Sequence, residues 1–356
     1  MKTLHRIFPF LLLVYHLAFA WVGYRYILNH HGDAERYWFL GQDLASSSWT
    51  DFLKPGTDVV RFLTFPLVKF FGMPFWSGFF IFSLLSFSGI ALLYRTLMQR
   101  AGDSPRHQLL VMVLMLLPNF HFWTSLIGKE AVLIIPIALF IREVSLKKYF
   151  SFLLLGSVFF IALIRPHIAF ILLLSYVLSL LWTLRLPNRY KAIILGGLFS
   201  ATALFAFLLT RLQDFSGGFQ RVLQKYEAHI RHFKTTDGYI PLDEYQLPYK
   251  IFTFWFRPLP FEKVGVLYTV LSIENMFLFL LSVWVAVYVV KYFPVLKNRM
   301  LFVLPVVFVF IFSVMYVYAY ANYGIIMRTR VMAVPFLYLL FMEVFDMRFS
   351  RNYSNT

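Results

Sequence analysis

The chain has 356 residues, of which 60% are hydrophobic and only 14% are charged, whereas a soluble domain carries about 25% charged residues. This composition excludes a water-soluble globular protein, and the absence of cysteine excludes disulfides, thiolate metal sites and cysteine nucleophiles. The net charge of +16 is scattered between apolar runs, which favours anionic membrane partners and argues against nucleic acid as a partner.

Apolar runs of about 17–25 residues are long enough to cross roughly 30 Å of hydrocarbon. Residues 1–20 also fit a signal peptide, but the apolar run continues to residue 27, so we expect an uncleaved helix there. The sequence predicts an all-α polytopic transmembrane bundle, one membrane domain over residues 1–356. Its spans, about ten, are expected at 7–27, 75–94, 109–125, 131–141, 150–163, 168–184, 192–210, 266–290, 301–320 and 331–344.

The direction of these spans follows from the charges of the short loops, because Lys and Arg accumulate in cytoplasmic loops. Cations outnumber acids at the N-terminus, at the C-terminus and in every second short loop: 95–106, 142–148, 185–191 and 291–299. We therefore expect both termini in the cytoplasm, with two longer segments outside the bilayer at 29–73 and 211–263.

The first outer loop contains a carboxylate directly after the first apolar run. Gly32 allows a sharp turn, and Asp33 stands where it could cap a short helix over 34–44. The same carboxylate, at the membrane surface, could instead act as a general base or a metal ligand. A second helix, over 58–71, mixes apolar and charged residues and is expected to lie at the membrane interface.

The run at 109–125 is interrupted by Pro118 and His121, which end or distort a helix, and Lys129 and Glu130 begin the next one. A glutamate at a helix N-terminus is stabilised by the helix dipole, which gives Glu130 a structural explanation. A cation at the same place is disfavoured. Lys129 is therefore predicted to pair with an acid or to bind an anion.

Several arginines also fall on the outer side. Arg165 and His167 occupy a very short outer turn, although an arginine at a helix end could simply extend to the interface. Two arginines, Arg328 and Arg330, enter the last span, and the planar guanidinium group matches phosphate. Glu274, inside the eighth span, is a candidate partner for one of them because an unpaired carboxylate is costly in a membrane.

Together these residues predict an anion site at one membrane depth on the outer side. Its cations would be Lys129, Arg165, Arg257, Arg328 and Arg330, and His167 is expected to bind the phosphate with them. A polyprenyl-phosphate or pyrophosphate lipid carries its charged head at this depth.

The Gly-Asp-Ala-x-x-Tyr pattern of residues 32–37 resembles the first outer loop of the GT-C glycosyltransferases, and the two outer helices resemble the juxtamembrane helices of that loop. Segments 123–130, 165–166 and 256–258 are similar to bacterial membrane proteins of surface-polysaccharide assembly. The resemblance implies a catalytic role for Asp33, with Glu35 as a second acidic candidate, and leaves a divalent cation open as a cofactor. Further candidate site residues are Arg36, Tyr37, His121, Glu130, His167 and Glu274.

Three functions follow from this pattern. The first is an inverting glycosyltransferase that moves a sugar from a polyprenyl-phosphate donor to a glycan or lipid acceptor, on the extracytoplasmic face of a bacterial cytoplasmic membrane. The second is a polymerase that joins pyrophosphate-linked repeat units, and the third is a flippase for lipid-linked sugars. The flippase is less favoured because paired halves and broken mid-membrane helices, typical of transporters, are not found. A purely structural membrane subunit is a further alternative.

Overall fold

In a computed structural model of the chain, the described residues are helical, apart from loops and one isolated bridge between Tyr239 and Asn322. The prediction of an all-α protein is confirmed for this part of the chain. The described residues are 2–39, 47–184, 187–212, 224, 227–228, 230–236, 238–262 and 265–349.

Five of these helices are long and apolar enough to cross a membrane. They are α1 (Lys2–His30), α4 (Phe75–Ala101), α9 (Pro166–Thr183), α13 (Val266–Leu296) and α14 (Met300–Ala319).

Two bent helix pairs would raise the number to seven if each pair is one span. They are α6 (Pro118–Thr124) with α7 (Lys129–Ser145), bent by 115°, and α15 (Tyr323–Arg330) with α16 (Val334–Phe349), bent by 57°. The chain is therefore a multi-pass membrane protein, and the finer count of about ten spans stays a prediction. The remaining predicted runs fall on α5 (Pro105–Met115), α8 (Phe152–Ile164) and α10 (Asn188–Leu212).

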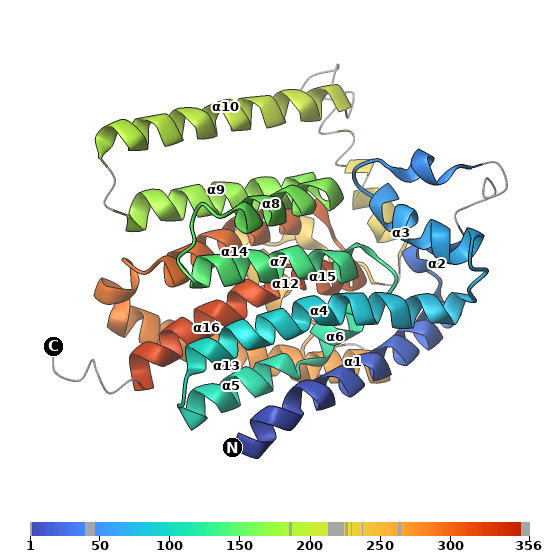
Figure 1. The fold of residues 1–356 in the computed structure, drawn as a ribbon, viewed down its shortest axis with the longest axis horizontal. Helices are drawn as coiled ribbons and strands as arrows, with labels where there is room; N and C mark the ends of the chain where they lie inside the picture. The colour runs from blue at the N-terminus through green and yellow to red at the C-terminus, as the bar shows by residue number, and fades with distance from the viewer. Residues whose placement is uncertain are drawn as a thin grey trace.

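The long helices lie side by side along the longest axis of the molecule (Figure 1). Helix α4 packs against α1 and α7, α7 packs against α8, and α14 packs between α9 and α16. Helix α10 lies at the edge of the bundle, next to α9. The short helices α2 (Asp33–Trp38) and α3 (Asp58–Lys69) gather at one end, on the right of Figure 1.

A glycine permits a close backbone contact between α4 and α7. A Cβ atom on Gly89 of α4 would lie 2.8 Å from the backbone carbon of Ile134 in α7. Helices in membranes associate through such close backbone approaches, because apolar side chains gain little by leaving lipid for protein. This contact holds α7 firmly against α4, and the first turn of α7 contributes to the site described below.

The first outer loop differs in part from its prediction. Helix α3 matches the interfacial helix expected at 58–71, but α2 ends at Trp38, and residues 40–44 of the helix expected at 34–44 lie outside the described part of the chain. Asp33 is the first residue of α2 rather than its N-cap, which is Gly32. The prediction that Asp33 caps this helix is therefore wrong, and its carboxylate is available for other partners.

The run expected at 109–125 is also broken. Helix α5 ends at Met115, and Pro118 starts α6 because proline is favoured in a first helical turn and cannot continue a preceding helix. Helix α6 then turns sharply into α7, which begins at Lys129 as predicted.

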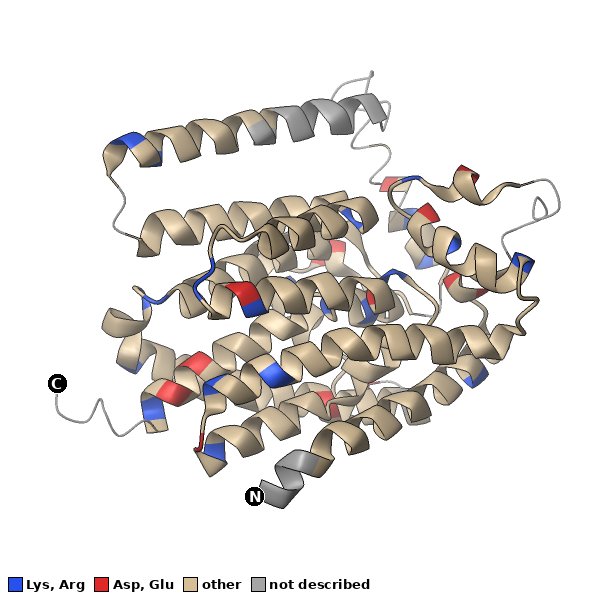
Figure 2. Cartoon of the chain, viewed as in Figure 1, with Lys and Arg blue, Asp and Glu red and all other residues tan. Residues whose placement is uncertain are grey.

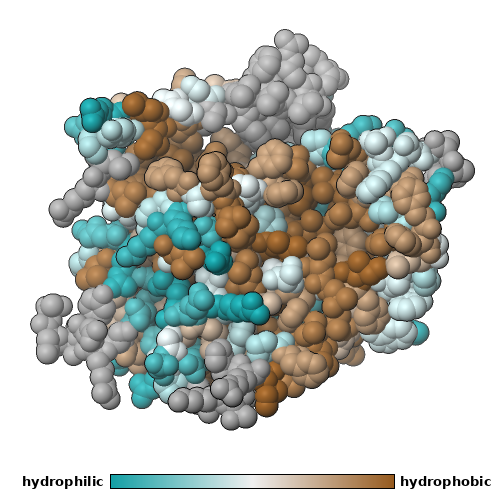
Figure 3. All heavy atoms as spheres, in the orientation of Figure 1, coloured by the Kyte–Doolittle hydropathy of each residue, from teal (hydrophilic) through white to brown (hydrophobic). Residues whose placement is uncertain are grey.

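Charged residues lie mostly toward the two ends of the bundle, with few between them (Figure 2). On the face seen in Figure 3, hydrophilic residues gather at the left and apolar residues cover the middle. This is the distribution that a bilayer requires of a protein with an apolar belt and two polar ends.

The predicted orientation is testable because the chain has no native cysteine. Arg36, whose side chain is 80% exposed, follows the first span, and Lys147 is exposed just after α7. We expect a membrane-impermeant maleimide to label Arg36→Cys in intact cells, and to label Lys147→Cys only after the membrane is permeabilised. Labelling of Lys147→Cys in intact cells, with Arg36→Cys protected, would show the opposite orientation.

Candidate functional site

A cavity of about 170 Å³ opens at the end of the bundle that carries α2. Its walls come from the end of α1, from α2, from the turn between α6 and α7, and from the start of α15. The polar side chains that line it include Asp33, Tyr37, Glu130, Asn322 and Arg328. Segments far apart in the sequence thus meet at one place.

Asp33 and Arg328 face each other in this cavity. The Nη1 atom of Arg328 donates a hydrogen bond of 2.8 Å to Asp33 Oδ2. Burial raises the pKa of the Asp33 carboxyl. Arg328, with smaller contributions from Arg36 and Lys129, outweighs this effect, so the pKa lies below its ordinary value. Asp33 is therefore ionised at neutral pH and bound to a cation.

Helix α2, which carries Asp33, is held in place by its neighbours. Thr64 of α3 donates a hydrogen bond of 2.7 Å from its hydroxyl to the backbone carbonyl of Tyr37. Tyr37 and Trp38 are buried, and Asp33, one turn earlier, keeps 37% of its side chain exposed. The carboxylate is thus fixed in position yet accessible from the cavity.

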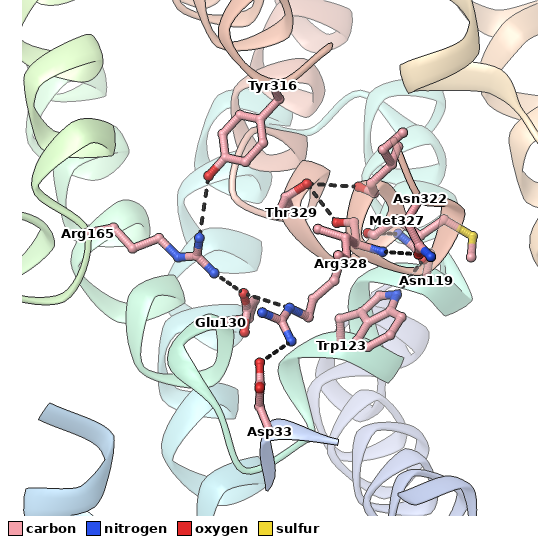
Figure 4. A network of polar contacts seen from close by, with 12 residues as sticks. Asp33, Asn119, Trp123, Glu130, Arg165, Tyr316, Asn322, Met327, Arg328 and Thr329 are labelled. Atoms are coloured by element: carbon pink, nitrogen blue, oxygen red, sulfur yellow. Dashed lines mark hydrogen bonds and ion pairs between the residues drawn. The ribbon is translucent and has the colours of Figure 1, made fainter. Parts of the chain in front are cut away.

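Glu130 forms the centre of the network and is almost fully buried, with 5% of its surface exposed. Its Oε1 atom accepts a hydrogen bond of 2.5 Å from Arg165 Nη2 and lies 3.4 Å from Arg328 Nε (Figure 4). One carboxylate therefore joins the turn between α8 and α9 to helix α15. Burial lowers the pKa of Arg165, but Glu130 together with Tyr316 and Tyr320 raises it, and the net pKa lies above the ordinary value, so the guanidinium stays charged.

The network continues to α14 through Tyr316. Arg165 Nη1 donates to the Tyr316 hydroxyl oxygen at 3.5 Å, and His167 Nε2 lies 3.4 Å from the same oxygen. His167 therefore reaches the network indirectly, through Tyr316, and does not line the cavity.

Lys129 stands beside these groups without an ion pair of its own. Among the described residues no carboxylate oxygen lies within 4 Å of its amine, although its charge interacts with Arg165, Glu130, Arg328 and Asp33. The group contains three cations, Lys129, Arg165 and Arg328, and two carboxylates, Asp33 and Glu130; Arg328 and both carboxylates line the cavity, whereas Lys129 and Arg165 stand behind its wall. The surplus is positive, as an anion site requires.

Part of the outer segment 211–263 contacts the wall of the cavity at Asn322. Tyr239 forms a β-bridge with Asn322, and the backbone N–H of Ile240 donates to the carbonyl of Ala321 at 2.9 Å. Asn322 also donates from its side chain to Thr236 Oγ1 at 2.9 Å and caps α15. The wall that presents Arg328 is therefore attached to the long outer segment.

Arg330 and Glu274 do not belong to the cavity. Arg330 is 1% exposed and donates to the carbonyl of Trp255 at 2.7 Å and to Asn275 Oδ1 at 2.5 Å. Glu274 accepts a hydrogen bond of 2.6 Å from the backbone N–H of Asn119, and no ion pair within 4 Å joins it to either predicted arginine in the described part of the chain. Both residues connect helices inside the bundle.

Of three other predicted residues, Arg257 and Glu35 have partners outside the network. Arg257 is bound by Glu262, at 3.0 Å from Nε to each carboxylate oxygen. Glu35 accepts from His31 at 3.1 Å, and the exposed Arg36 lies 3.9 Å from the second oxygen of Asp33. Of these three residues, only Arg36 contacts a member of the network, Asp33. The site is therefore smaller than the sequence predicts.

His121 lies in the core, with no exposed surface, and packs against a residue that sequence reasoning did not single out. Its Nδ1 lies 3.0 Å from Nδ1 of His16, and its Nε2 lies 2.6 Å from the carbonyl of Met115. Since the carbonyl only accepts, His121 must carry its proton on Nε2, and His16 must then donate from Nδ1. His16 Nε2 in turn lies 2.8 Å from the hydroxyl of Ser86. The histidine pair serves to join α1, α4 and α6.

Tyr316 and Asn322 were also missed. A tyrosine in an apolar run and an asparagine in a loop carry no local signal, since such residues commonly occupy interfaces and caps. Only the fold places them beside residues more than 80 positions away.

The donor set does not fit a divalent cation. Asp33 and Glu130 each have an arginine within ion-pair distance, so a metal ion would have to displace a guanidinium and face the remaining positive charges. Within the described ranges no group of three metal-ligating side chains is close enough to hold a metal. No step proposed below uses one.

No protein-family model matches this chain, and comparisons with curated proteins and with solved structures likewise find no match. The likeness to GT-C glycosyltransferases therefore rests on the residues of the first outer loop alone, and the site has to be interpreted from its chemistry.

Replacing Glu130 tests the network directly. Glu130→Gln keeps the shape of the side chain but leaves Arg165 and Arg328 without their shared carboxylate. Removing one partner of a buried ion pair costs about 3–5 kcal/mol. We expect a large fall in the melting temperature of the detergent-purified protein, with unfolding measured by tryptophan fluorescence.

The matched control is Glu227→Gln, which removes an exposed carboxylate 3.9 Å from Arg231 and should leave the melting temperature nearly unchanged. Adding Arg165→Met to Glu130→Gln should recover part of the loss, because it removes one of the uncompensated charges. Equal melting of Glu130→Gln and the native protein would contradict a structural role for the network.

Proposed function

We propose that this chain is a membrane glycosyltransferase that uses a polyprenyl-phosphate-linked sugar and transfers it on the extracytoplasmic face. The observation that carries this proposal is the pair of Asp33 and Arg328 in a cavity at one end of the bundle, with Lys129 and Arg165 beside it. A base and a set of cations are the two elements that sugar transfer from a phosphate requires.

The cations suit the phosphate of the donor. Arg328 offers a planar guanidinium toward the cavity, and Lys129 adds a charge that no carboxylate within 4 Å neutralises among the described residues. As the glycosidic bond breaks, negative charge grows on the departing phosphate, so these contacts strengthen in the transition state. This is how they would contribute to catalysis as well as to binding.

An exchange of partners would activate Asp33. Before the donor binds, Arg328 holds the pKa of Asp33 below its ordinary value, which makes the carboxylate a weak base. A donor phosphate that binds Arg328 competes with this contact and lowers the net positive charge around Asp33. The pKa of Asp33 then rises toward the range that general-base catalysis favours.

Sugar transfer would then take place in one displacement at the anomeric carbon. Asp33 takes the proton of an acceptor hydroxyl, and the acceptor oxygen forms a bond to the anomeric carbon. The bond between that carbon and the phosphate oxygen breaks, and polyprenyl phosphate leaves with the bonding electrons. Attack opposite the leaving group inverts the anomeric configuration.

A second feature supports a lipid-linked donor. An apolar groove of about 360 Å³ lies between α5, α6 and α13, and it is lined by residues such as Leu117, Val270 and Phe277. Helix α6 borders this groove at Pro118 and the cavity at Trp123. A prenyl chain fits an apolar groove in this position, close to where its phosphate would be held.

The proposal predicts a clear loss of function in cells that depend on this protein for their glycan. Asp33→Asn keeps the shape of the side chain and removes the base, which is expected to lower activity by about 10²–10⁴-fold. Arg328→Ala removes the guanidinium group that would hold the phosphate and is expected to lower activity by about 10²–10³-fold. Glycans extracted from a deletion strain carrying each variant give the measurement.

Lys54→Ala is the matched control, because Lys54 is an exposed cation of the same outer loop that does not line the cavity. It should restore full glycan production. Full restoration by Asp33→Asn, in protein that is present at native levels, would rule out the proposed mechanism. Accumulation of single complete repeat units would instead identify a polymerase.

A further inference from the structure

A second cavity, of about 520 Å³, lies at the other end of the bundle. It is bordered by Lys147, just after α7, whereas Lys129 and Glu130 of the first site occupy the first turn of that helix. A helix of 17 residues is about 25 Å long, so the two cavities are separate. Helix α16 also lines it, as do the end of α4, the end of α9 and the turn between α13 and α14, which lie at the left of Figure 1.

Positive charge dominates this second cavity. Its lining contains Arg100, Lys147 and Arg299 and one carboxylate, Glu343. Glu343 is 2% exposed and accepts hydrogen bonds of 2.5 Å from Arg100 and 2.8 Å from Arg299. Arg299 also lies 3.7 Å from Asp346, which is outside the lining, whereas Lys147 has no ion pair within the described ranges. The lining itself therefore keeps a net positive charge that an anion would complement.

An apolar groove of about 320 Å³ lies next to the cavity. Leu178 of α9 and Val303 and Val306 of α14 belong to its walls, and Lys297 and Trp182 stand at its polar end. Trp182 donates a hydrogen bond of 2.8 Å from its indole N–H to the carbonyl of Lys297.

The groove and the cavity share one junction. Trp182 and Lys297 border the groove, while their chain neighbours Thr183 and Asn298 border the cavity. Cations, an indole and an apolar groove therefore meet where the end of α9 contacts the turn between α13 and α14. Tryptophan and lysine in this arrangement are typical of a membrane–water interface.

We propose that this junction binds an anionic phospholipid, with one acyl chain in the groove and the phosphate near Lys297, Arg299 and Lys147. A free phosphate would not use the groove, and a zwitterionic lipid would bring a cationic head toward a cationic surface. The loop charges predict that this end is cytoplasmic, where anionic lipids attract basic residues. The proposal does not depend on the enzymatic function suggested for the other end.

The experiment uses the full-length protein in detergent and measures binding by native mass spectrometry and by the rise in melting temperature. The probes are a phosphatidylglycerol, a phosphatidylcholine with the same acyl chains, and inorganic phosphate. Phosphatidylglycerol is expected to bind at least about tenfold more tightly than phosphatidylcholine, the scale set by two or three basic residues near a lipid surface. Inorganic phosphate is expected to have no effect at the same concentration.

Two pairs of variants locate the site. Lys147→Glu should weaken phosphatidylglycerol binding by about tenfold, whereas Lys148→Glu, the same change one residue on and outside the lining, should not. Val306→Trp should block the groove, while Phe310→Trp, on an exposed position of the same helix, should leave binding unchanged.

Lys147 is exposed, so its variant tests the proposal even if Val306→Trp disturbs folding. Equal binding of the two lipids, or equal effects of Lys147→Glu and Lys148→Glu, would mean non-specific lipid contact and overturn the proposal. Stabilisation by inorganic phosphate alone would identify a free-anion site and would overturn it as well.

Discussion

The buried carboxylate of Glu130 has to neutralise two arginines at once, and the architecture of the candidate site depends on this contact. Arg165 comes from the turn between α8 and α9, and Arg328 comes from α15, so the contact fixes two separate parts of the chain against the start of α7. Burial makes the arrangement stable only as a whole, because each charge is costly without its partner. Arg328 is thereby held where its outer Nη1 atom meets Asp33 in the cavity.

The Arg328 guanidinium contacts two carboxylates through different nitrogen atoms, so one residue could stabilise the fold and also take part in a reaction. Its Nε faces the buried Glu130, and its Nη1 faces Asp33, which is partly exposed to the cavity. A ligand phosphate can replace the contact with Asp33 while the contact with Glu130 remains. The exchange would bind the donor and release the base in one event, without moving a helix.

The sequence predicted the helical membrane class, the break at Pro118, the helix start at Lys129 and the short turn at Arg165, because each has a local signal. It could not decide which of two nearby residues faces the cavity. Positions two apart on a helix point about 200° apart, so Arg328 enters the cavity while Arg330 is buried against Trp255 and Asn275. The same spacing separates Asp33 from Glu35. Arg165 and its partner Tyr316 are 151 positions apart, and Arg328 and its partner Asp33 are 295 positions apart. Local sequence patterns cannot predict such pairs, because only the fold brings them together.

An experimental structure of the protein with polyprenyl phosphate bound would test the proposed site most directly. We expect phosphate oxygens within about 3 Å of Arg328 and close to Lys129, with Asp33 no longer bound to Arg328. Glu130 would still join Arg165 to Arg328. A phosphate bound elsewhere, for example at Arg257, with the contact between Asp33 and Arg328 unchanged, would contradict the central claim.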